Sequence, residues 1–296
     1  MTGTTRVVQV DGHRVGLVTA GSGEPLVLLH GIGRDHGDWD AVLPALAERY
    51  TVYAIDVEGF GESEAWGPRV TLRSMAAMVR RTLVALGERR PVRIVGNSMG
   101  GAVALRMLAD DPAAVCALVL ISPAGFGADA ALGLRLMTLP GLGPLLLRFS
   151  VTGAYLRLQA LLDGPAALDT AELALRAARR MHRLDARRWY LDVVHDLGRW
   201  RGVREEWRRE VIAALAAAAT PTLVLWGERD VVLPHAHLAA AAAALPHAVT
   251  RSLPGLGHSP QIEAPGPTAA MILEFLAGVA PATAAAAALR RTDAAS

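Results

Sequence analysis

Gly96-Asn97-Ser98-Met99-Gly100 is the stretch of sequence that decides the fold of this chain. The apolar run 92–95 precedes it and the helix-like run 102–105 follows it. A strand therefore turns sharply into a helix here, with a serine at the tip of the turn. Such a turn needs glycine on both sides of the serine, because a Cβ at either position would collide with neighbouring backbone. The pattern predicts a nucleophilic serine, held strained and exposed.

A nucleophilic serine needs a base, an acid that orients the base, and hydrogen-bond donors for the oxyanion. The donors are expected from a turn early in the chain. The apolar run 26–29 leads directly into His30-Gly31-Ile32-Gly33, a glycine-rich turn that can point a backbone N–H at the developing oxyanion. We therefore expect the backbone N–H groups of Ile32 and Met99 to form the oxyanion hole.

The acid and the base are expected late in the chain. The apolar run 222–226 ends in a Gly-x-x-Asp turn that presents Asp230, and a glycine-rich turn presents His258 before the closing helix. Asp230 is the predicted acid and His258 the predicted base. Asp129 is the main rival acid, but the buried strand before Asp230 offers the rigid support that a triad acid requires. Glu263 is expected to point away along the closing helix.

The order Ser98, Asp230, His258, with His30-Gly31 before it, resembles the α/β-hydrolase superfamily over nearly the whole chain. The resemblance implies that the histidine of the early turn is structural and holds that turn by hydrogen bonds. The residues expected to support the site are His30, Gly31, Gly96, Asn97 and Gly100.

A second loop resembles the same superfamily. Residues 56–63, Asp-Val-Glu-Gly-Phe-Gly-Glu-Ser, resemble its D-x-P-G-x-G-x-S loop, with Glu58 in the place where proline is usual. We expect this departure to loosen the loop without touching a catalytic role.

Two subgroups of the superfamily are the leading candidates. Residues 96–101 are close to the form seen in some lipases and in hydrolases that cleave carbon–carbon bonds of aromatic-ring fission products. Asn97 favours the second subgroup. Ser259 argues against it, because those enzymes commonly carry tryptophan directly after the catalytic histidine.

Short apolar runs that alternate with helical patterns predict an α/β fold with a parallel sheet covered on both faces. The resemblance implies a mostly parallel eight-stranded sheet, built from residues 1–124 and 219–280. An opening hairpin is expected first. The expected strands are 7–10, 15–20, 26–29, 51–56, 92–96 and 117–122, and the expected helices are about 38–49, 71–87 and 99–109. The site would lie at the carboxyl ends of the strands.

The strand signal disappears between residues 125 and 218, and we interpret this segment as a helical cap inserted over the sheet. Substrate choice would depend on it. Its arginines could line an anionic pocket or form a solvated face, and the second is favoured because such helices need a charged side. These arginines include Arg179, Arg180, Arg187 and Arg188. Residues 281–296 are expected to form a flexible tail.

Composition narrows the function classes. The chain has 30 basic and 28 acidic residues, a formal net charge of +2, and no lysine. Positive and negative residues are nearly equal in number and spread along the chain, so the composition does not indicate nucleic-acid binding.

No stretch approaches the roughly 20 apolar residues that cross a bilayer, so we expect a cytoplasmic protein without stable membrane insertion. Cys116 begins an apolar run and is expected to be buried. His235 and His237 lack a third ligand, and no metal or cofactor is implied.

Together these features predict a serine hydrolase that cleaves a small or medium, largely apolar carboxylic ester through an acyl-enzyme. The alternative is a carbon–carbon hydrolase of vinylogous diketones from aromatic-ring fission. A ligand receptor on the same fold is a third interpretation, against which the complete triad argues. The expected partner is a small-molecule substrate. The sequence leaves open the exact substrate, its stereochemistry and whether the chain forms a homodimer.

Overall fold

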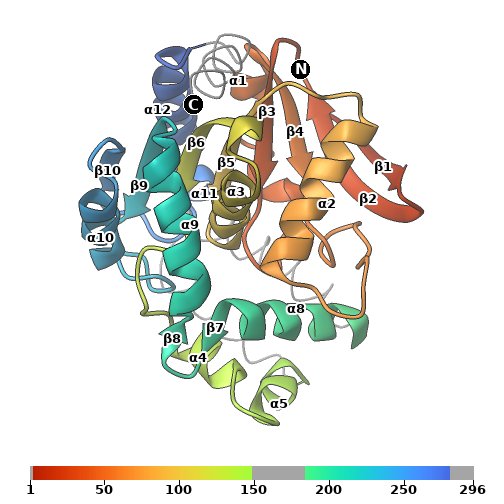
Figure 1. Cartoon of the computed structure of the whole chain (residues 1–296), viewed down its shortest axis with the longest axis vertical. Helices are drawn as coiled ribbons and strands as arrows, with labels where there is room; N and C mark the ends of the chain where they lie inside the picture. Colours follow the sequence, from red (N-terminus) through yellow and green to blue (C-terminus); the bar gives the residue numbers. More distant parts are fainter. Residues whose placement is uncertain (1–2, 149–183, 281–296) are drawn as a thin grey trace, which may run out of the picture.

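The computed structural model describes residues 3–148 and 184–280, and its centre is an eight-stranded sheet (Figure 1). The strand order is β1-β2-β4-β3-β5-β6-β9-β10. The pairs β1/β2 and β2/β4 are antiparallel, and the remaining pairs are parallel, which confirms the predicted sheet. The strands are β1 (Thr4–Val10), β2 (His13–Ala20), β3 (Glu24–Leu29), β4 (Tyr50–Ile55), β5 (Val92–Asn97), β6 (Val115–Ile121), β9 (Thr222–Gly227) and β10 (Val249–Leu253).

Helices cover both faces of this sheet (Figure 1). One face carries α2, α3, α9 and α10, and the other carries α1 and α12. The helices of the two layers are α1 (Leu43–Ala47), α2 (Leu72–Ala85), α3 (Met99–Asp110), α9 (Glu205–Ala218), α10 (Ala236–Ala244) and α12 (Pro265–Ala277). Short turns of helix join them at η1 (His36–Trp39), η2 (Pro112–Ala114) and α11 (Pro260–Glu263).

Strand β6 shows why the central runs are apolar at every position. Leu118 and Leu120 pack into the core under α2, α3 and α9, whereas Val119 and Ile121 pack into the core under α1 and α12. Successive side chains of a strand point to opposite faces, so a strand covered on both faces needs apolar residues throughout. The two cores hold the carboxyl ends of the parallel strands at one edge of the sheet.

One predicted helix is broken in the structure. In place of a helix over 38–49 the chain forms η1 and the short helix α1. The side chain of Asp35 caps η1, and Pro44 lies in the first turn of α1. Proline fits the first turn of a helix but has no N–H to continue an earlier one, so the segment divides before it.

A smaller layer lies at the end of the molecule that follows the strands' carboxyl edge (Figure 1). It contains α4 (Leu132–Met137), α5 (Leu142–Arg148), α8 (Leu184–Leu197) and a hairpin of β7 (Gly198–Arg199) and β8 (Gly202–Val203). This hairpin is a strand pair in a segment expected to be helical. The rest of the predicted cap, 149–183, and the predicted tail, 281–296, lie outside the described residues.

Helix α9 falls within the range predicted for the cap, yet it packs against α3. Its Val211 and Leu215 belong to the same core as Leu105 of α3. We therefore propose that the cap ends near residue 204 and that α9 belongs to the core layer. In the described ranges, no helix combines the length and the apolar character needed to span a bilayer.

Candidate active site

Ser98 lies at the strained turn between β5 and α3. Its φ is +54°, in a region that non-glycine residues rarely adopt. A Cβ on Gly96 would lie 2.5 Å from the carbonyl oxygen of Gly100, and a Cβ on Gly100 would collide with the carbonyl oxygen of Leu29. The predicted reason for both glycines is confirmed. The serine itself is only 7% exposed, so the expected exposed nucleophile is instead covered.

Asp230 and His258 lie in the turns after β9 and β10 and are joined by a hydrogen bond. Oδ2 of Asp230 lies 2.7 Å from Nδ1 of His258, and Oδ1 accepts the N–H groups of Val232 and Leu233 at 2.8 and 2.9 Å. Burial by itself raises the pKa of Asp230, but these hydrogen bonds outweigh it and hold the pKa below its usual value. The carboxylate therefore stays charged beside the imidazole and favours the tautomer with the proton on Nδ1.

The rival acid lies elsewhere. Asp129 follows β6, and its charge acts on His237, whose pKa is lowered overall by burial. Both ring nitrogens of His237 lack a hydrogen-bond partner among the described residues. His235 lies 2.9 Å from the hydroxyl of Ser252. Asp230 is thus the acid that contacts His258.

The early glycine-rich turn lies against Ser98. A Cβ on Gly31 would be 3.6 Å from Cβ of Ser98. The buried ring of His30 accepts the N–H of Val57 at Nε2 (3.0 Å), so its Nδ1 carries the proton and donates to the carbonyl of Gly31 (2.8 Å). Burial lowers the pKa of His30 and keeps the ring neutral. The histidine therefore fastens this turn to the loop after β4.

Two backbone N–H groups remain available beside the serine. Within the described part of the chain, neither Ile32 nor Met99 has a backbone N–H acceptor in the hydrogen-bond network. Met99 is the first residue of α3, where an N–H has no partner within the helix. In the same network, no bond joins the hydroxyl of Ser98 to His258.

Asn97 and Glu263 hold the backbone around His258. The amide of Asn97 donates to the carbonyls of Ile121 (3.1 Å) and His258 (3.0 Å). The carboxylate of Glu263 accepts the N–H groups of Gly257 (2.6 Å) and Ser259 (2.9 Å), one on each side of the histidine. The expectation that Glu263 points away was wrong, because its side chain turns back toward unpaired amides at the start of α11. A carboxylate in the first turn after a glycine-rich loop is the signal that could have revealed it.

Glu58 is fully buried, and it braces the loop that it was expected to loosen. Its Oε1 accepts the N–H of Trp66 at 2.8 Å. Burial raises the pKa of Glu58 more than its polar contacts with Ser74 and Trp66 lower it. Trp189 of α8 packs against this loop at Gly59 (φ +79°). A Cβ on Gly59 would lie 3.0 Å from the Trp189 side chain.

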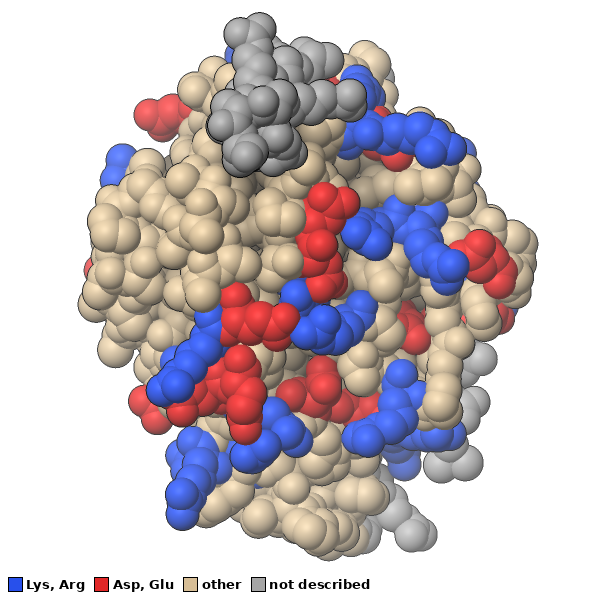
Figure 2. Space-filling view, viewed as in Figure 1, with Lys and Arg blue, Asp and Glu red and all other residues tan. Residues whose placement is uncertain are grey.

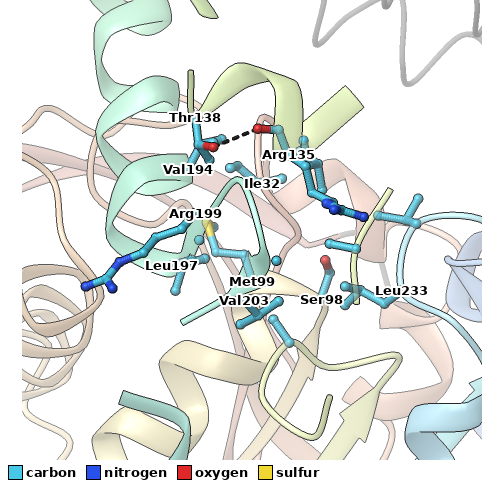
Figure 3. A pocket seen from close by; sticks show the side chains of 16 residues that line it. Ile32, Ser98, Met99, Arg135, Thr138, Val194, Leu197, Arg199, Val203 and Leu233 are labelled. Carbon is cyan, nitrogen blue, oxygen red and sulfur yellow. Dashed lines mark hydrogen bonds between the residues drawn. The ribbon is translucent and has the colours of Figure 1, made fainter. Parts of the chain in front are cut away.

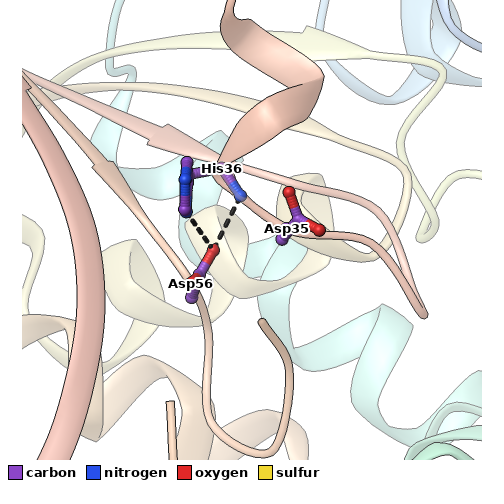
Figure 4. A group of neighbouring side chains, drawn as sticks. All are labelled: Asp35, His36 and Asp56. Carbon is purple, nitrogen blue, oxygen red and sulfur yellow. Dashed lines mark hydrogen bonds and ion pairs between the residues drawn. The ribbon is translucent and has the colours of Figure 1, made fainter. Parts of the chain in front are cut away.

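Asp35, His36 and Asp56 form a group of potential metal ligands in the described ranges (Figure 4). Oδ1 of Asp56 accepts from both the backbone N–H and Nδ1 of His36, at 2.7 and 2.9 Å, and Oδ2 accepts from the N–H of Glu62. Asp35 caps the N–H of Gly37. These bonds join the loop after β4 to η1, and they occupy the carboxylate oxygens.

A pocket lined by Ser98 lies between the carboxyl edge of the sheet and the layer of α4, α8 and the β7–β8 hairpin (Figure 3). Its walls come from α4, α8, the β7–β8 hairpin and the turn after Asp230. Apolar side chains make up most of the wall, and they include Ile32, Met99, Leu134, Val194, Leu197 and Leu233. Asp230 and His258 are not among the lining residues, but Leu233, whose N–H binds Asp230, is one of them.

Comparisons with known proteins agree with this geometry. A family model described as the alpha/beta hydrolase fold matches residues 24–265. An uncharacterised protein of Mycobacterium tuberculosis (strain H37Rv) is 32% identical over 301 residues, which cover 95% of this chain and 83% of that protein. The solved structure of a membrane phospholipase A is 30% identical, with a TM-score of 0.74 over 94% of this chain and 86% of that one. A serine hydrolase involved in carbazole degradation is 26% identical, with a TM-score of 0.73 over 93% and 99%.

Proposed function

The chain belongs to the α/β-hydrolase family, and from this premise we propose that it is a serine hydrolase that cleaves a carboxylic ester through an acyl-enzyme. The observation that carries the proposal is the 2.7 Å contact between His258 and Asp230 beside the strained Ser98 turn. An imidazole held in this tautomer can take a proton at Nε2. The mostly apolar pocket favours a small or medium ester with a largely apolar acyl or alcohol part.

In the proposed reaction the Ser98 hydroxyl attacks the ester carbonyl while Nε2 of His258 takes its proton. The N–H groups of Ile32 and Met99 hold the negative oxygen, each contributing roughly 3 kcal/mol. The imidazolium then gives its proton to the departing alcohol, which leaves an ester between the acyl group and Ser98. Water repeats these steps and releases the acid. The hydroxyl and imidazole need to approach during the reaction, as is common for sites without substrate.

A fluorophosphonate probe tests the nucleophile. We expect one adduct, mapped to Ser98 by peptide mass spectrometry, and Ser98→Ala should lower turnover of p-nitrophenyl butyrate by about 10⁴-fold or more. Ser252→Ala, an exposed serine on β10, is the matched control and should keep full activity. An adduct on another serine, or activity within tenfold of the parent in Ser98→Ala, would disprove the assignment.

The same assay tests the acid. Asp230→Asn should lower kcat by about 10⁴-fold, because an amide no longer holds the imidazole in the productive tautomer. Asp129→Asn should change kcat by less than about twofold. Reversed effects would transfer the role to Asp129.

Carbon–carbon bond hydrolysis is the second candidate. It is supported by 36% identity, over 123 residues that cover 40% of this chain, to a 2-hydroxy-6-oxo-6-(2'-aminophenyl)hexa-2,4-dienoic acid hydrolase of Metapseudomonas resinovorans. The two candidates share the proposed triad and differ in substrate. We expect a higher kcat/KM for p-nitrophenyl butyrate than for a ring-fission dienoate, because Ser259 follows His258 at the position where carbon–carbon hydrolases commonly carry tryptophan. A preference for the dienoate would establish the second candidate instead.

A further inference from the structure

Two arginines in the pocket wall are turned in opposite directions (Figure 3). The guanidinium of Arg199, on the β7–β8 hairpin, points away from Ser98 and pairs with Glu206 at 2.9 Å. The guanidinium of Arg135, on α4, turns to the side of the pocket where the Ser98 hydroxyl lies. Only the second can meet a substrate bound at the serine.

Arg135 is held in place by contacts with Trp200 that do not neutralise the charge of its guanidinium. Its Nε donates to the carbonyl of Trp200 at 2.8 Å, and its guanidinium carbon lies 5.1 Å from the centre of the Trp200 ring. Within the described ranges, no carboxylate forms an ion pair with Arg135. The nearby hydroxyl of Thr138 donates to a helix carbonyl at 2.7 Å. The terminal nitrogens of Arg135 therefore keep donors for a ligand.

Two arginines of a neighbouring crevice, Arg73 and Arg106, are paired with carboxylates of the protein. A band of mixed charge crosses the face over α2, α3 and α9 (Figure 2). In the crevice beneath this band, Arg73 and Arg106 each lie 2.8 Å from the same oxygen of Glu210. An anion arriving there would have to displace a carboxylate that is already bound. Among the residues that the structure describes, Arg135 has no such carboxylate bound to it.

We propose that Arg135 binds a carboxylate carried by the substrate, at the end of an apolar spacer that begins at the scissile ester. The proposal rests on the serine hydrolase function proposed above. Arg135 is half-buried at the edge of the pocket, and a guanidinium can bind a carboxylate through two parallel charge-assisted hydrogen bonds. Ser98 and Arg135 line the same mostly apolar pocket, which suits the methylene groups of a dicarboxylic acid monoester.

The test compares two esters that differ in one charge, at low ionic strength. p-Nitrophenyl butyrate is the neutral ester, and the mono-p-nitrophenyl ester of glutaric acid is the anionic one. We expect Arg135→Gln to lower the ratio of kcat/KM for the anionic to the neutral ester by roughly 10- to 100-fold, mainly through KM. Arg135→Lys should recover part of the ratio, since it keeps the charge and loses the planar fork. Arg199→Gln removes the same charge from the outward-pointing arginine and should leave the ratio within about twofold.

A binding measurement separates this proposal from the proposed function. The monobutylamide of glutaric acid resists hydrolysis, and its binding by calorimetry should weaken at least tenfold in Arg135→Gln. If the parent binds this amide through Arg135 but hydrolyses neither ester, the esterase proposal fails and the anion site stands. An unchanged ester ratio, or amide binding that is the same in parent and Arg135→Gln, would overturn the anion site. Labelling of Ser98 by a small neutral phosphonate verifies that each variant is folded.

Discussion

At the residue scale, the position of His258 depends on side chains outside the proposed triad. Glu263 binds the backbone N–H before the histidine and the one after it, and Asn97 binds the histidine's own carbonyl. These bonds leave the turn few ways to move while the imidazole faces Asp230. Because misplacing a catalytic group by about 1 Å can cost roughly 100-fold in rate, the carboxylate of Glu263 is a positioning group.

Glu263→Gln should therefore reduce kcat by roughly 10- to 100-fold while KM changes by less than about twofold. An amide offers one acceptor oxygen in place of two, so one of the two N–H bonds is lost. Steady-state kinetics with p-nitrophenyl butyrate measure the effect, and a thermal melt verifies folding. Glu274→Gln, an exposed glutamate on α12, is the control. A kcat within twofold of the parent would mean that Asn97 alone suffices.

At the element scale, the loop after β4 connects the sheet to η1 and to α8. Asp56 holds η1 through His36, Glu58 holds Trp66 within the loop, and Trp189 of α8 packs on Gly59. Burial of Glu58 is costly for its charged form, which is why its pKa is raised. The loop thus contains a carboxyl group whose protonation favours the folded state.

The sign of this effect gives a stability prediction. A raised folded-state pKa contributes stability that is full below the unfolded pKa of the carboxyl, about 4.3, and is lost as pH rises through the folded pKa. Glu58→Gln keeps the acceptor for Trp66 and removes the charge. We expect it to raise Tm by about 2 °C at pH 8 and by less at pH 4.

Scanning calorimetry at the two pH values measures the difference. Glu62→Gln, an exposed neighbour that lies 3.8 Å from Arg14, is the control and should show no such pH dependence. A variant that is less stable than the parent at pH 8 would show that the charge of Glu58 stabilises the loop.

At the scale of the whole molecule, the turns after the strands present Ser98, Asp230 and His258 at one edge of the sheet. The smaller layer beyond this edge contributes walls of the pocket over Ser98, from α4, α8 and the β7–β8 hairpin. Tyr190 of α8 also packs on the early glycine-rich turn, since a Cβ on Gly33 would lie 3.1 Å from its ring. Burial raises the pKa of Tyr190 to about 12, so its hydroxyl stays neutral there. We propose that the cap selects substrate and the core performs the chemistry.

Leu134→Ala tests this division of work. Leu134 lines the pocket, and shortening it should move the preferred acyl chain toward longer esters. We expect the ratio of kcat/KM for hexanoate to acetate esters to rise roughly 10-fold, since each methylene in an apolar pocket contributes about 1 kcal/mol or more. Phosphonate labelling of Ser98 should stay within a few fold.

Leu132→Ala is the matched control, because Leu132 lies on the same helix and is 59% exposed. It should leave the chain-length preference unchanged. Loss of labelling in a folded Leu134→Ala protein would mean that the cap completes the catalytic machinery.

The sequence by itself determined the sheet and the turns that end its strands. Local patterns carry this information: continuous apolar runs mark strands covered on both faces, and glycines mark turns where a Cβ would collide with backbone, as at Gly96 and Gly100. Because parallel strands end at one edge of a sheet, their order along the chain also predicted which turns meet. Asp230 was preferred over Asp129 because its Gly-x-x-Asp turn directly ends a buried strand, which gives a triad acid rigid support.

Only the tertiary structure decided which side chains turn toward the site. Glu58, Glu263 and Arg135 look like ordinary surface charges in the sequence, yet one is buried, one binds the histidine turn and one faces the pocket. Their directions depend on backbone amides and apolar surfaces contributed by segments far away in the chain, such as Trp66 for Glu58 and Trp200 for Arg135. The packing of α9 against α3 likewise depends on an apolar surface contributed by a segment far away in the chain. Periodicity predicts that a helix has an apolar face, but the surface that the face covers is decided by long-range packing.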